Sequence, residues 1–485
     1  MAGALRASRH ERAQPHGGLS HTLRGERRDP CRLARRAQRD HAGSGCNGAE
    51  APGAAGASPV QPEHRWCSRS IAGATGASLV LPPDLEHLGR MQQTNPVVIV
   101  SAARTALGGF QGGLGTKSAA ELGAVAIAAA VSRAGLQGSD VDEALLGCVL
   151  PAGQGQAPAR QAVLGAGLPL SVGATTINKM CGSGMKAAML AHDLLLAGGA
   201  RVVVAGGMES MTNAPYLLPK ARAGLRMGHA ALVDHMFFDG LEDAYDKGRL
   251  MGTFAEDCAG AYAFSREEQD AWAIRSLERA KRANEDGTFA AEIAVVTVTD
   301  RKGSRAIGRD EQPFVADPSK IAGLRPAFRK DGTVTAANSS SISDGAAALV
   351  MMREDEAARR GLNPLARVVA HATHAQEPAL FTTAPVAAIA KVQALAGWTK
   401  SEVDLYEINE AFAVVTMAAI RDHALDPETV NVHGGACALG HPIGASGARI
   451  LVTLLGALRK HSLRRGVASL CIGGGEATAM AVELL

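Results

Sequence analysis

The chain has 485 residues, of which 46% are hydrophobic and only 4% aromatic, and it contains 56 glycines. This composition is typical of a globular α/β protein with a large core and closely packed helices and strands, which excludes a fibrous or largely disordered chain. The formal net charge is +3, but residues 1–90 hold thirteen arginines against eight acidic residues, so the remainder is slightly negative. With no basic stripe in that remainder, we expect no nucleic-acid partner.

Residues 1–93 lack apolar periodicity and are rich in Arg, Gly, Ala, Pro and Ser, so we expect a disordered N-terminal extension. An organelle transit peptide is one interpretation, although the interspersed acidic residues fit it poorly. The alternative, which we favour, is that translation naturally begins at Met91, just before the first expected strand. We therefore expect a cytoplasmic protein, with organellar targeting by the Arg-rich extension as the alternative.

The eight cysteines form no pair with the spacing of a zinc site, and five of them are scattered beyond residue 90. Such scattered cysteines are typical of a reducing compartment rather than of a disulfide scaffold. We find no apolar run long enough to span a bilayer, so we expect a soluble protein without a membrane span.

Two stretches of the chain resemble each other in register. Residues 134–142 (Ala-Gly-Leu, then Ser-Asp-Val-Asp) return as residues 396–404 (Ala-Gly-Trp, then Ser-Glu-Val-Asp). In each copy a helix is expected to end at glycine, and an apolar strand follows over 144–149 or 405–408. A later strand that runs into a glycine turn is also present twice, at 201–209 and 466–476. This repetition indicates a gene duplication and two packed α/β units of similar topology.

The segment between the two copies has a different pattern. Ser265 and Glu268 form a capping-box signal, which predicts an amphipathic helix to about Asn284, and a strand is expected over 293–299. We therefore expect four regions. These are an extension (1–93), an N-terminal half (94–212 and 339–363), an inserted loop or substrate-binding domain (213–338) and a C-terminal half (364–485).

Cys181 lies in a glycine-bracketed turn that opens an apolar helix. The N–H groups and dipole of a helix N-terminus lower the pKa of a thiol, which favours a reactive thiolate. A small buried hydrophobe is the alternative interpretation. The equivalent turn of the second copy carries His441, so the duplication predicts that Cys181 and His441 face one shared cleft.

Three further residues complete the set, each with a structural alternative. His441, between Gly440 and Pro442, is either a general base or a packing histidine. Cys471 ends a buried strand and is either reactive or a core cysteine, and Asn409 is either functional or a helix cap. A thiol beside a histidine is the arrangement of covalent acyl transfer. A second cysteine is unnecessary for hydrolysis, but it fits the deprotonation of a carbon acid.

The chain from about residue 94 to the C-terminus resembles the thiolase family, which includes acetyl-CoA acetyltransferases and 3-ketoacyl-CoA thiolases. The resemblance implies two duplicated βαβαβαββ halves in a layered α-β-α-β-α core of the α/β class, with an inserted loop domain. The motifs that carry it occur in family order at 101–105 (Ser-Ala-Ala-Arg-Thr), 178–184 (Asn-Lys-Met-Cys-Gly-Ser-Gly), 409–412 (Asn-Glu-Ala-Phe), 434–447 (from Gly-Gly to Gly-His-Pro-Ile-Gly-Ala-Ser-Gly) and 471–475 (Cys-Ile-Gly-Gly-Gly).

The resemblance also implies the role of each residue. His441 deprotonates Cys181, the acyl-thioester nucleophile, and Cys471 acts as general acid and base on the second substrate. The enolate oxygen is held by His441 and by a water fixed on Asn409. The backbone N–H groups of Cys181 and Gly473 form the other oxyanion hole.

Four further residues are implied in substrate binding: Met251, Phe328, Ser340 and Phe412. No metal and no cofactor is expected beyond the coenzyme A thioesters that serve as substrates. The chain departs from many relatives at Leu250, where they have histidine, and at Glu476, where they have a smaller or amide residue. Both departures leave the acyl-length preference open.

The expected function is reversible Claisen condensation or thiolysis through an acyl-cysteine, most simply two acetyl-CoA ⇌ acetoacetyl-CoA + CoA. A broader-chain degradative 3-ketoacyl-CoA thiolase of fatty-acid metabolism is the first alternative. A non-catalytic lipid-binding relative is the second, and the presence of all four reactive residues disfavours it. A homodimer or homotetramer is expected from the resemblance alone.

Overall fold

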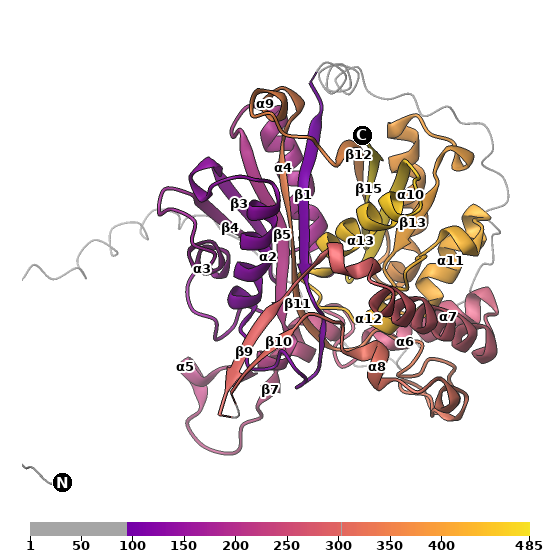
Figure 1. Ribbon diagram of the computed structural model, residues 1–485. Coiled ribbons are helices and arrows are strands. Elements are labelled where there is room, and N and C mark those ends of the chain that lie inside the picture. The colour runs from indigo at the N-terminus through magenta and orange to yellow at the C-terminus, as the bar shows by residue number, and fades with distance from the viewer. Residues whose placement is uncertain (1–94, 302) are drawn as a thin grey trace, which may run out of the picture. The chain divides into compact units, whose positions relative to one another are not determined.

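The computed structural model in Figure 1 describes residues 95–301 and 303–485. The expected extension over 1–93, including the proposed start at Met91, lies outside the described residues.

Eleven of the described strands form one mixed sheet, which is the frame of the fold. These strands are β1 (Val97–Thr105), β2 (Gly108–Gly109), β3 (Glu143–Gly147), β4 (Gly173–Ile177), β5 (Val202–Ser210), β8 (Ile293–Ala294), β11 (Ser343–Arg353), β12 (Ala366–Ala375), β13 (Leu405–Ile408), β14 (Arg465–Ile472) and β15 (Glu476–Leu484). The main order is β13-β14-β15-β12-β1-β11-β5-β3-β4, with β2 paired to β11 and β8 paired to β1.

The two halves of this sheet repeat one pairing pattern. In the first half β3 is parallel to β5, β5 is antiparallel to β11, and β11 is antiparallel to β1. In the second half β13, β14, β15 and β12 follow the same sequence of parallel and antiparallel pairs. A parallel bridge between Tyr406 and Val430 takes the place that β4 has in the first half. The strand pairing thus reproduces the duplication expected from the sequence.

Helices cover the sheet in layers. The layer helices are α2 (Ala119–Arg133), α3 (Pro158–Gly165), α4 (Ser183–Leu196), α10 (Ala384–Ala396), α11 (Ala413–His423) and α13 (Ser446–Lys460). Helices α2 and α3 pack on strands of the first half, and α10 packs on strands of the second half (Figure 1). Helices α4 and α13 contact strands of both halves, so they form the central layer of an α-β-α-β-α arrangement.

The two central helices approach each other through glycines at equivalent positions of the two copies. A Cβ atom on Gly447 would lie 2.3 Å from the backbone nitrogen of Met185, and one on Gly184 would lie 2.8 Å from that of Ala448. Side chains at either glycine would therefore separate the helices. This contact brings together the turns that precede α4 and α13, and these turns carry Cys181 and His441.

The segment between the halves has its own small elements. They are β6 (Tyr216–Leu217), β7 (Val233–Asp234), α5 (Ala221–Gly224), α6 (Met251–Tyr262), α7 (Arg266–Glu285), β9 (Val296–Asp300), β10 (Gly303–Ile307) and α8 (Gln312–Val315). Helix α7 begins with the predicted capping box, in which the Ser265 hydroxyl accepts from the Glu268 N–H and the Glu268 carboxylate accepts from the Ser265 N–H. The expected strand over 293–299 is divided at the exposed Val295, because β8 pairs with β1 whereas β9 pairs with β10.

Shorter helical elements complete the described chain. They are α9 (Glu354–Arg359), α12 (Ala436–Leu439), the π-helical turn η4 (Phe237–Leu241), and the 3-10 turns η2 (Gly138–Asp140), η3 (Met211–Asn213), η5 (Thr288–Ala291), η6 (Pro318–Gly323), η7 (Pro378–Thr383), η8 (Lys400–Glu402) and η9 (Pro427–Thr429).

One helical stretch corrects the expectation that no apolar run is long enough to cross a membrane. Pro378–Ala396, which joins η7 to α10, reaches that length and hydropathy. Its α10 part packs on β12 and β15, and Ala388, Ile389 and Val392 are fully buried there. These contacts are those of a core helix, whose apolar side faces a sheet rather than lipid.

Candidate active site

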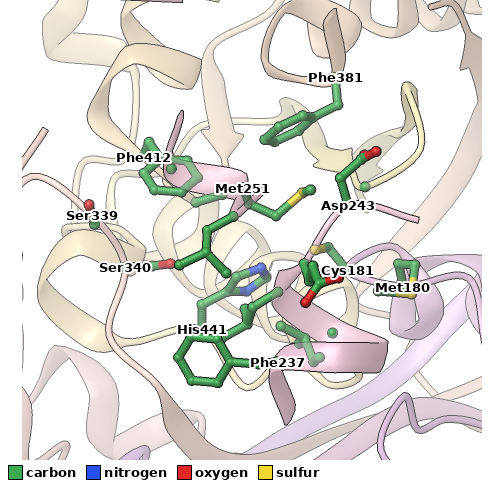
Figure 2. Close-up of a pocket in the computed structure, with 18 of the residues that line it drawn as sticks. Met180, Cys181, Phe237, Asp243, Met251, Ser339, Ser340, Phe381, Phe412 and His441 are labelled. Carbon is green, nitrogen blue, oxygen red and sulfur yellow. The ribbon is translucent and has the colours of Figure 1, made fainter. Parts of the chain in front are cut away.

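A cavity of about 640 Å³ brings together the reactive residues that the sequence singled out. Cys181, His441 and Cys471 all line it, and Figure 2 shows Cys181 and His441 within it. They come from three places in the fold: the turn before α4, the turn before α13, and the end of β14. Gly473 also lines the cavity, whereas Asn409 lies behind His441 and contacts its ring.

The turn that carries Cys181 has an unusual backbone conformation. Met180, directly before the cysteine, has φ +46°, a left-handed conformation that costs energy for a residue with a side chain. The Asn178 carboxamide accepts a hydrogen bond from the Met180 N–H, and the Ser183 hydroxyl accepts from the Lys179 N–H and donates to the Met180 carbonyl. These bonds hold the strained turn, and with it the position of the Cys181 sulfur.

The expectation that the pKa of Cys181 lies below its ordinary value is wrong, although the backbone N–H groups do lower it. Burial raises the pKa of this thiol to about 11, although the backbone N–H groups of Gly473 and of Cys181 itself lower it. Burial is the larger effect because a thiolate in apolar surroundings loses its hydration. Cys181 is therefore a thiol at neutral pH and needs a base to become a nucleophile.

The hydrogen bonds of His441 determine which ring nitrogen is free to act as that base. Its Nδ1 lies 2.6 Å from the Ser446 hydroxyl oxygen, and this hydroxyl donates its single proton to the Pro442 carbonyl at 3.0 Å. With that proton on the Pro442 carbonyl, the Ser446 oxygen accepts from Nδ1–H, and this assignment of the network leaves the lone pair on Nε2. Nε2 is buried and has no hydrogen-bond partner among the described residues.

The charge state of His441 agrees with this tautomer. Burial lowers the pKa of the imidazole to about 3, and the nearby Arg449 guanidinium lowers it further. The ring is consequently neutral at physiological pH. A neutral imidazole with a free lone pair at Nε2 can accept a proton from a thiol in the same cavity.

Asn409 is oriented by Arg449. The Asn409 carboxamide oxygen accepts from the Arg449 guanidinium at 3.3 Å, and Arg449 also forms a 3.6 Å ion pair with Glu407. In the Nδ1–H tautomer favoured by the much shorter Ser446 contact, the Asn409 amide nitrogen, 3.5 Å from Nδ1, is a neighbour of that atom and not a donor to it. The Asn409 amide N–H groups are therefore available beside the reactive histidine, and the alternative that Asn409 is a helix cap is wrong, because Phe412 is the N-cap of α11.

Cys471 lies almost completely buried near the end of β14. Burial raises the pKa of its thiol well above the ordinary value, and the neighbouring Cys181 raises it further. The turn that follows needs glycine, because Gly475 has φ +85° and a Cβ there would lie 2.4 Å from the Gln376 carbonyl oxygen. This turn places Gly473 beside the Cys181 sulfur.

The four residues implied in substrate binding also line the cavity: Met251, Phe328, Ser340 and Phe412. Met251 begins α6, and the Phe328 and Phe412 rings meet edge to face with centroids 5.9 Å apart. The two departures from the family pattern have structural roles here. Leu250 caps α6 and lines the cavity, and Glu476 forms an ion pair with Lys179, two residues before Cys181.

Glu209 is a fully buried carboxylate near Cys181 that was not anticipated from the sequence. It accepts hydrogen bonds from the N–H groups of Val149 and Gly444 at 2.9 Å and of Leu150 at 3.2 Å. Burial raises its pKa to about 7, whereas these bonds lower it. The carboxylate connects the turn after His441 to the segment after β3, and its signal in the sequence was an acidic residue in an otherwise apolar strand.

Comparison with known proteins agrees with this geometry. The model of the thiolase N-terminal domain matches residues 97–355, and that of the thiolase C-terminal domain matches residues 362–484. The chain is 51% identical over 405 residues to acetyl-CoA acetyltransferase 2 of Arabidopsis thaliana, which covers 83% of this chain and 100% of that relative. It is 49% identical over 394 residues to acetyl-CoA acetyltransferase of Rhizobium meliloti (strain 1021), covering 81% of this chain and 100% of the relative.

A solved structure shares the fold as well as the sequence. The crystal structure of the Bacillus anthracis acetyl-CoA acetyltransferase superposes with a TM-score of 0.79 at 41% identity, covering 81% of this chain and 99% of the other. The matches span the described sheet and both reactive turns. The chain belongs to the thiolase family.

Proposed function

We propose that this chain is an acetyl-CoA C-acetyltransferase that converts two acetyl-CoA into acetoacetyl-CoA and CoA, and that also runs the reverse thiolysis. The observation that carries the proposal is the shared cavity of Cys181, His441 and Cys471, in which His441 Nε2 has no hydrogen-bond partner among the described residues. Relatives at about half identity over nearly their whole length are named acetyl-CoA acetyltransferase, which supports acetyl-CoA as the substrate.

The first half-reaction is acylation of Cys181. His441 Nε2 takes the thiol proton, and the thiolate attacks the thioester carbonyl of the first acetyl-CoA. The oxyanion receives hydrogen bonds from the backbone N–H groups of Cys181 and Gly473, which already reach the sulfur. Each such donor typically lowers the barrier by about 3–4 kcal/mol. The carbon–sulfur bond to CoA breaks, the protonated His441 returns the proton to the CoA sulfur, and acetyl-Cys181 remains.

The second half-reaction is a condensation. Cys471 begins as a thiol because its pKa is raised, so it first passes its proton to the neutral His441. The Cys471 thiolate then removes a Cα proton from the second acetyl-CoA. The enolate oxygen is held by the Nε2–H of His441 and by a water on the Asn409 amide.

Carbon–carbon bond formation completes the cycle. The enolate carbon attacks the acetyl-Cys181 carbonyl, the bond from this carbonyl to the Cys181 sulfur breaks, and the sulfur recovers a proton from His441. Cys471 ends as a thiol, so both cysteines and the histidine return to their starting states. The chain's own residues move every proton in this scheme, and coenzyme A thioesters are its substrates.

A broader-chain 3-ketoacyl-CoA thiolase is the second candidate, and the apolar wall of the cavity favours it. Phe237, Phe238 and Leu250 line the cavity together with the substrate-binding residues named above. Apolar walls favour longer acyl chains by burying their methylene groups. The same reactive residues serve both functions, so acyl length alone separates them.

Thiolysis of 3-ketoacyl-CoAs from C4 to C16 by free CoA tests the proposal. We expect kcat/KM to be highest at C4 and to fall steeply with length. A flat profile or one that rises toward C16 would reject the acetyl-CoA assignment in favour of the broader-chain enzyme. Absence of acyl transfer at every length, from a folded protein, would favour the non-catalytic lipid-binding relative. We also propose, from the family alone, a cytoplasmic homodimer or homotetramer.

A further inference from the structure

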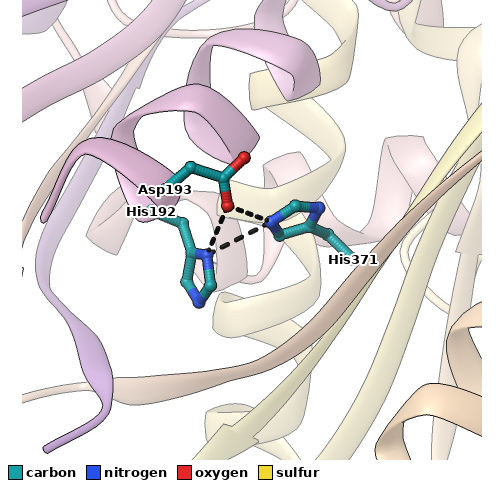
Figure 3. A group of neighbouring side chains, drawn as sticks. All are labelled: His192, Asp193 and His371. Carbon is teal, nitrogen blue, oxygen red and sulfur yellow. Dashed lines mark hydrogen bonds and ion pairs between the residues drawn. The ribbon is translucent and has the colours of Figure 1, made fainter. Parts of the chain in front are cut away.

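A second cluster of reactive side chains lies outside the cavity, where no step of the proposed reaction uses it. His192 and Asp193 lie near the end of α4, and His371 lies in the middle of β12 (Figure 3). The three atoms that meet are His192 Nδ1, Asp193 Oδ1 and His371 Nε2. The two nitrogens are 3.1 Å apart, and the carboxylate oxygen lies 3.1 Å from the first and 2.9 Å from the second.

Protons on the two rings do not give all three of these atoms a favourable hydrogen bond. Asp193 Oδ1 accepts a hydrogen bond well from one ring N–H, but if both nitrogens carry protons these protons meet across the 3.1 Å gap between the rings. If only one nitrogen is protonated, the lone pair of the other faces the carboxylate oxygen. A cation above the triangle attracts all three lone pairs at once.

The dimensions of the triangle fit a metal ion. Zinc binds imidazole nitrogen at about 2.0–2.1 Å and carboxylate oxygen at about 2.0–2.2 Å, so the ligand atoms of a tetrahedral site lie about 3.3–3.4 Å apart. An ion about 1 Å above the plane of the present three atoms would make bonds of this length, and an expansion of a few tenths of an ångström would complete the tetrahedral geometry. The three donors therefore already have almost the required spacing.

The protonation states are those of metal ligands. Burial lowers the pKa of His192, which keeps its ring neutral. Burial raises the pKa of Asp193, but its contacts with the His192 and His371 rings lower it by more, so the carboxylate is ionised. Neutral imidazole and ionised carboxylate are the forms that bind divalent metals.

We propose that His192, Asp193 and His371 form a binding site for a divalent transition metal of the zinc type. Two imidazoles and one carboxylate suit zinc, cobalt and nickel better than magnesium or calcium, which prefer oxygen ligands. His192 is 2% exposed, whereas the side chains of His371 and Asp193 are 17% and 53% exposed. The site thus has a buried wall and an open side, where a water can take the fourth position.

The site would join two parts of the fold that the reaction depends on. Helix α4 begins two residues after Cys181, and β12 is the strand of the second half that pairs with β1 of the first. A metal bound to both would fix the end of α4 to the sheet. Sequence spacing does not reveal this cluster, because His371 lies 179 positions from His192, and the family resemblance implied no metal.

Metal titration of the whole chain, first stripped with a chelator and dialysed, tests the proposal. Cobalt(II) should produce visible d–d absorption that saturates at one equivalent per chain, and zinc(II) should displace it, whereas magnesium and calcium should not. Zinc should also raise the melting temperature. Failure of zinc and cobalt to bind stoichiometrically to folded protein would overturn the proposal.

Two variants and one control locate the site. Asp193→Asn keeps the shape of an exposed side chain but removes the anionic ligand, and His371→Asn removes one imidazole, so each should weaken zinc binding at least tenfold and abolish the rise in melting temperature. His461→Asn is the control, because His461 and His433 form another histidine pair, with Nε2 atoms 3.2 Å apart, in which no described carboxylate is hydrogen-bonded to either ring. Unchanged binding in Asp193→Asn, or loss of binding in His461→Asn, would contradict the assignment. Circular dichroism and acetyl transfer should show that Asp193→Asn is folded and active.

Discussion

Removing the Ser446 hydroxyl should impair catalysis even though this residue does not line the cavity. In Ser446→Ala the Nδ1–H of His441 loses its 2.6 Å acceptor, and the Asn409 amide nitrogen, 3.5 Å from Nδ1, is a donor and cannot replace it. The proton is then free to move to Nε2, and in that tautomer His441 cannot accept the Cys181 proton.

The size of the effect follows from the buried hydrogen bond that is lost. Leaving one buried donor without a partner costs about 1–3 kcal/mol. If this cost falls on the reactive tautomer, the acylation rate decreases about 5- to 150-fold, because each 1.36 kcal/mol corresponds to a factor of ten. The KM for acetyl-CoA should change little, since the hydroxyl touches the histidine rather than the cavity.

Rapid-quench measurement of acetyl-Cys181 formation from labelled acetyl-CoA gives this rate directly. Thr453→Val is the matched control, because Thr453 is a fully buried residue of the same helix whose hydroxyl has no hydrogen-bond partner in the described part of the chain. We expect the control to acylate at the wild-type rate. Wild-type acylation by folded Ser446→Ala would refute the tautomer assignment.

Two further predictions concern the buried ionisable side chains of the site. Because burial lowers the pKa of His441 to about 3 and raises that of Cys181 to about 11, the neutral pair is the dominant form between these values, and activity should be lost only as the pH falls toward 3. The acylation kcat/KM, measured by stopped flow from pH 5 to 8, should therefore be flat, and an acid limb near pH 6.5 would count against a buried neutral histidine. Glu209→Gln replaces one of two acceptor oxygens with an NH₂ group that faces backbone N–H donors, so the free energy of unfolding should fall by about 1–3 kcal/mol. Urea denaturation measures this loss, and an unchanged midpoint and slope would show that the carboxylate does not stabilise the reactive turns.

The fold could be anticipated from the sequence because the same short motifs, such as glycines that end helices, occur in register in both copies. Glycine at 135 and 397 ends a helix in each copy, and in the structure both residues have positive φ values, +70° and +69°. The same register pointed to the pairing of the Cys181 and His441 turns, which the structure places in one cavity. The sequence did not predict the break at Val295. There one expected strand divides into β8, which pairs with β1 in the main sheet, and β9, which pairs with β10 in a separate sheet.

The electrostatics of the site could not be anticipated, because they depend on burial and on contacts between distant segments. The position of Cys181 at the N-terminus of α4 predicts a low pKa for its thiol. Burial of the thiol raises the pKa by more than the backbone N–H groups lower it. The tautomer of His441 depends on whether the Ser446 hydroxyl has another acceptor, and sequence spacing does not show this. The His192, Asp193 and His371 cluster likewise exists only once α4 and β12 are packed together.

Incubation of Cys181→Ser and Cys471→Ser with acetyl-CoA, followed by mass spectrometry of the digested protein, tests the division of labour between the two cysteines. We expect Cys471→Ser to accumulate acetyl-Cys181 and to form no acetoacetyl-CoA, whereas Cys181→Ser should not become acetylated. Condensation by Cys471→Ser at the wild-type rate, or acetylation of Cys181→Ser at residue 471, would contradict the proposed mechanism.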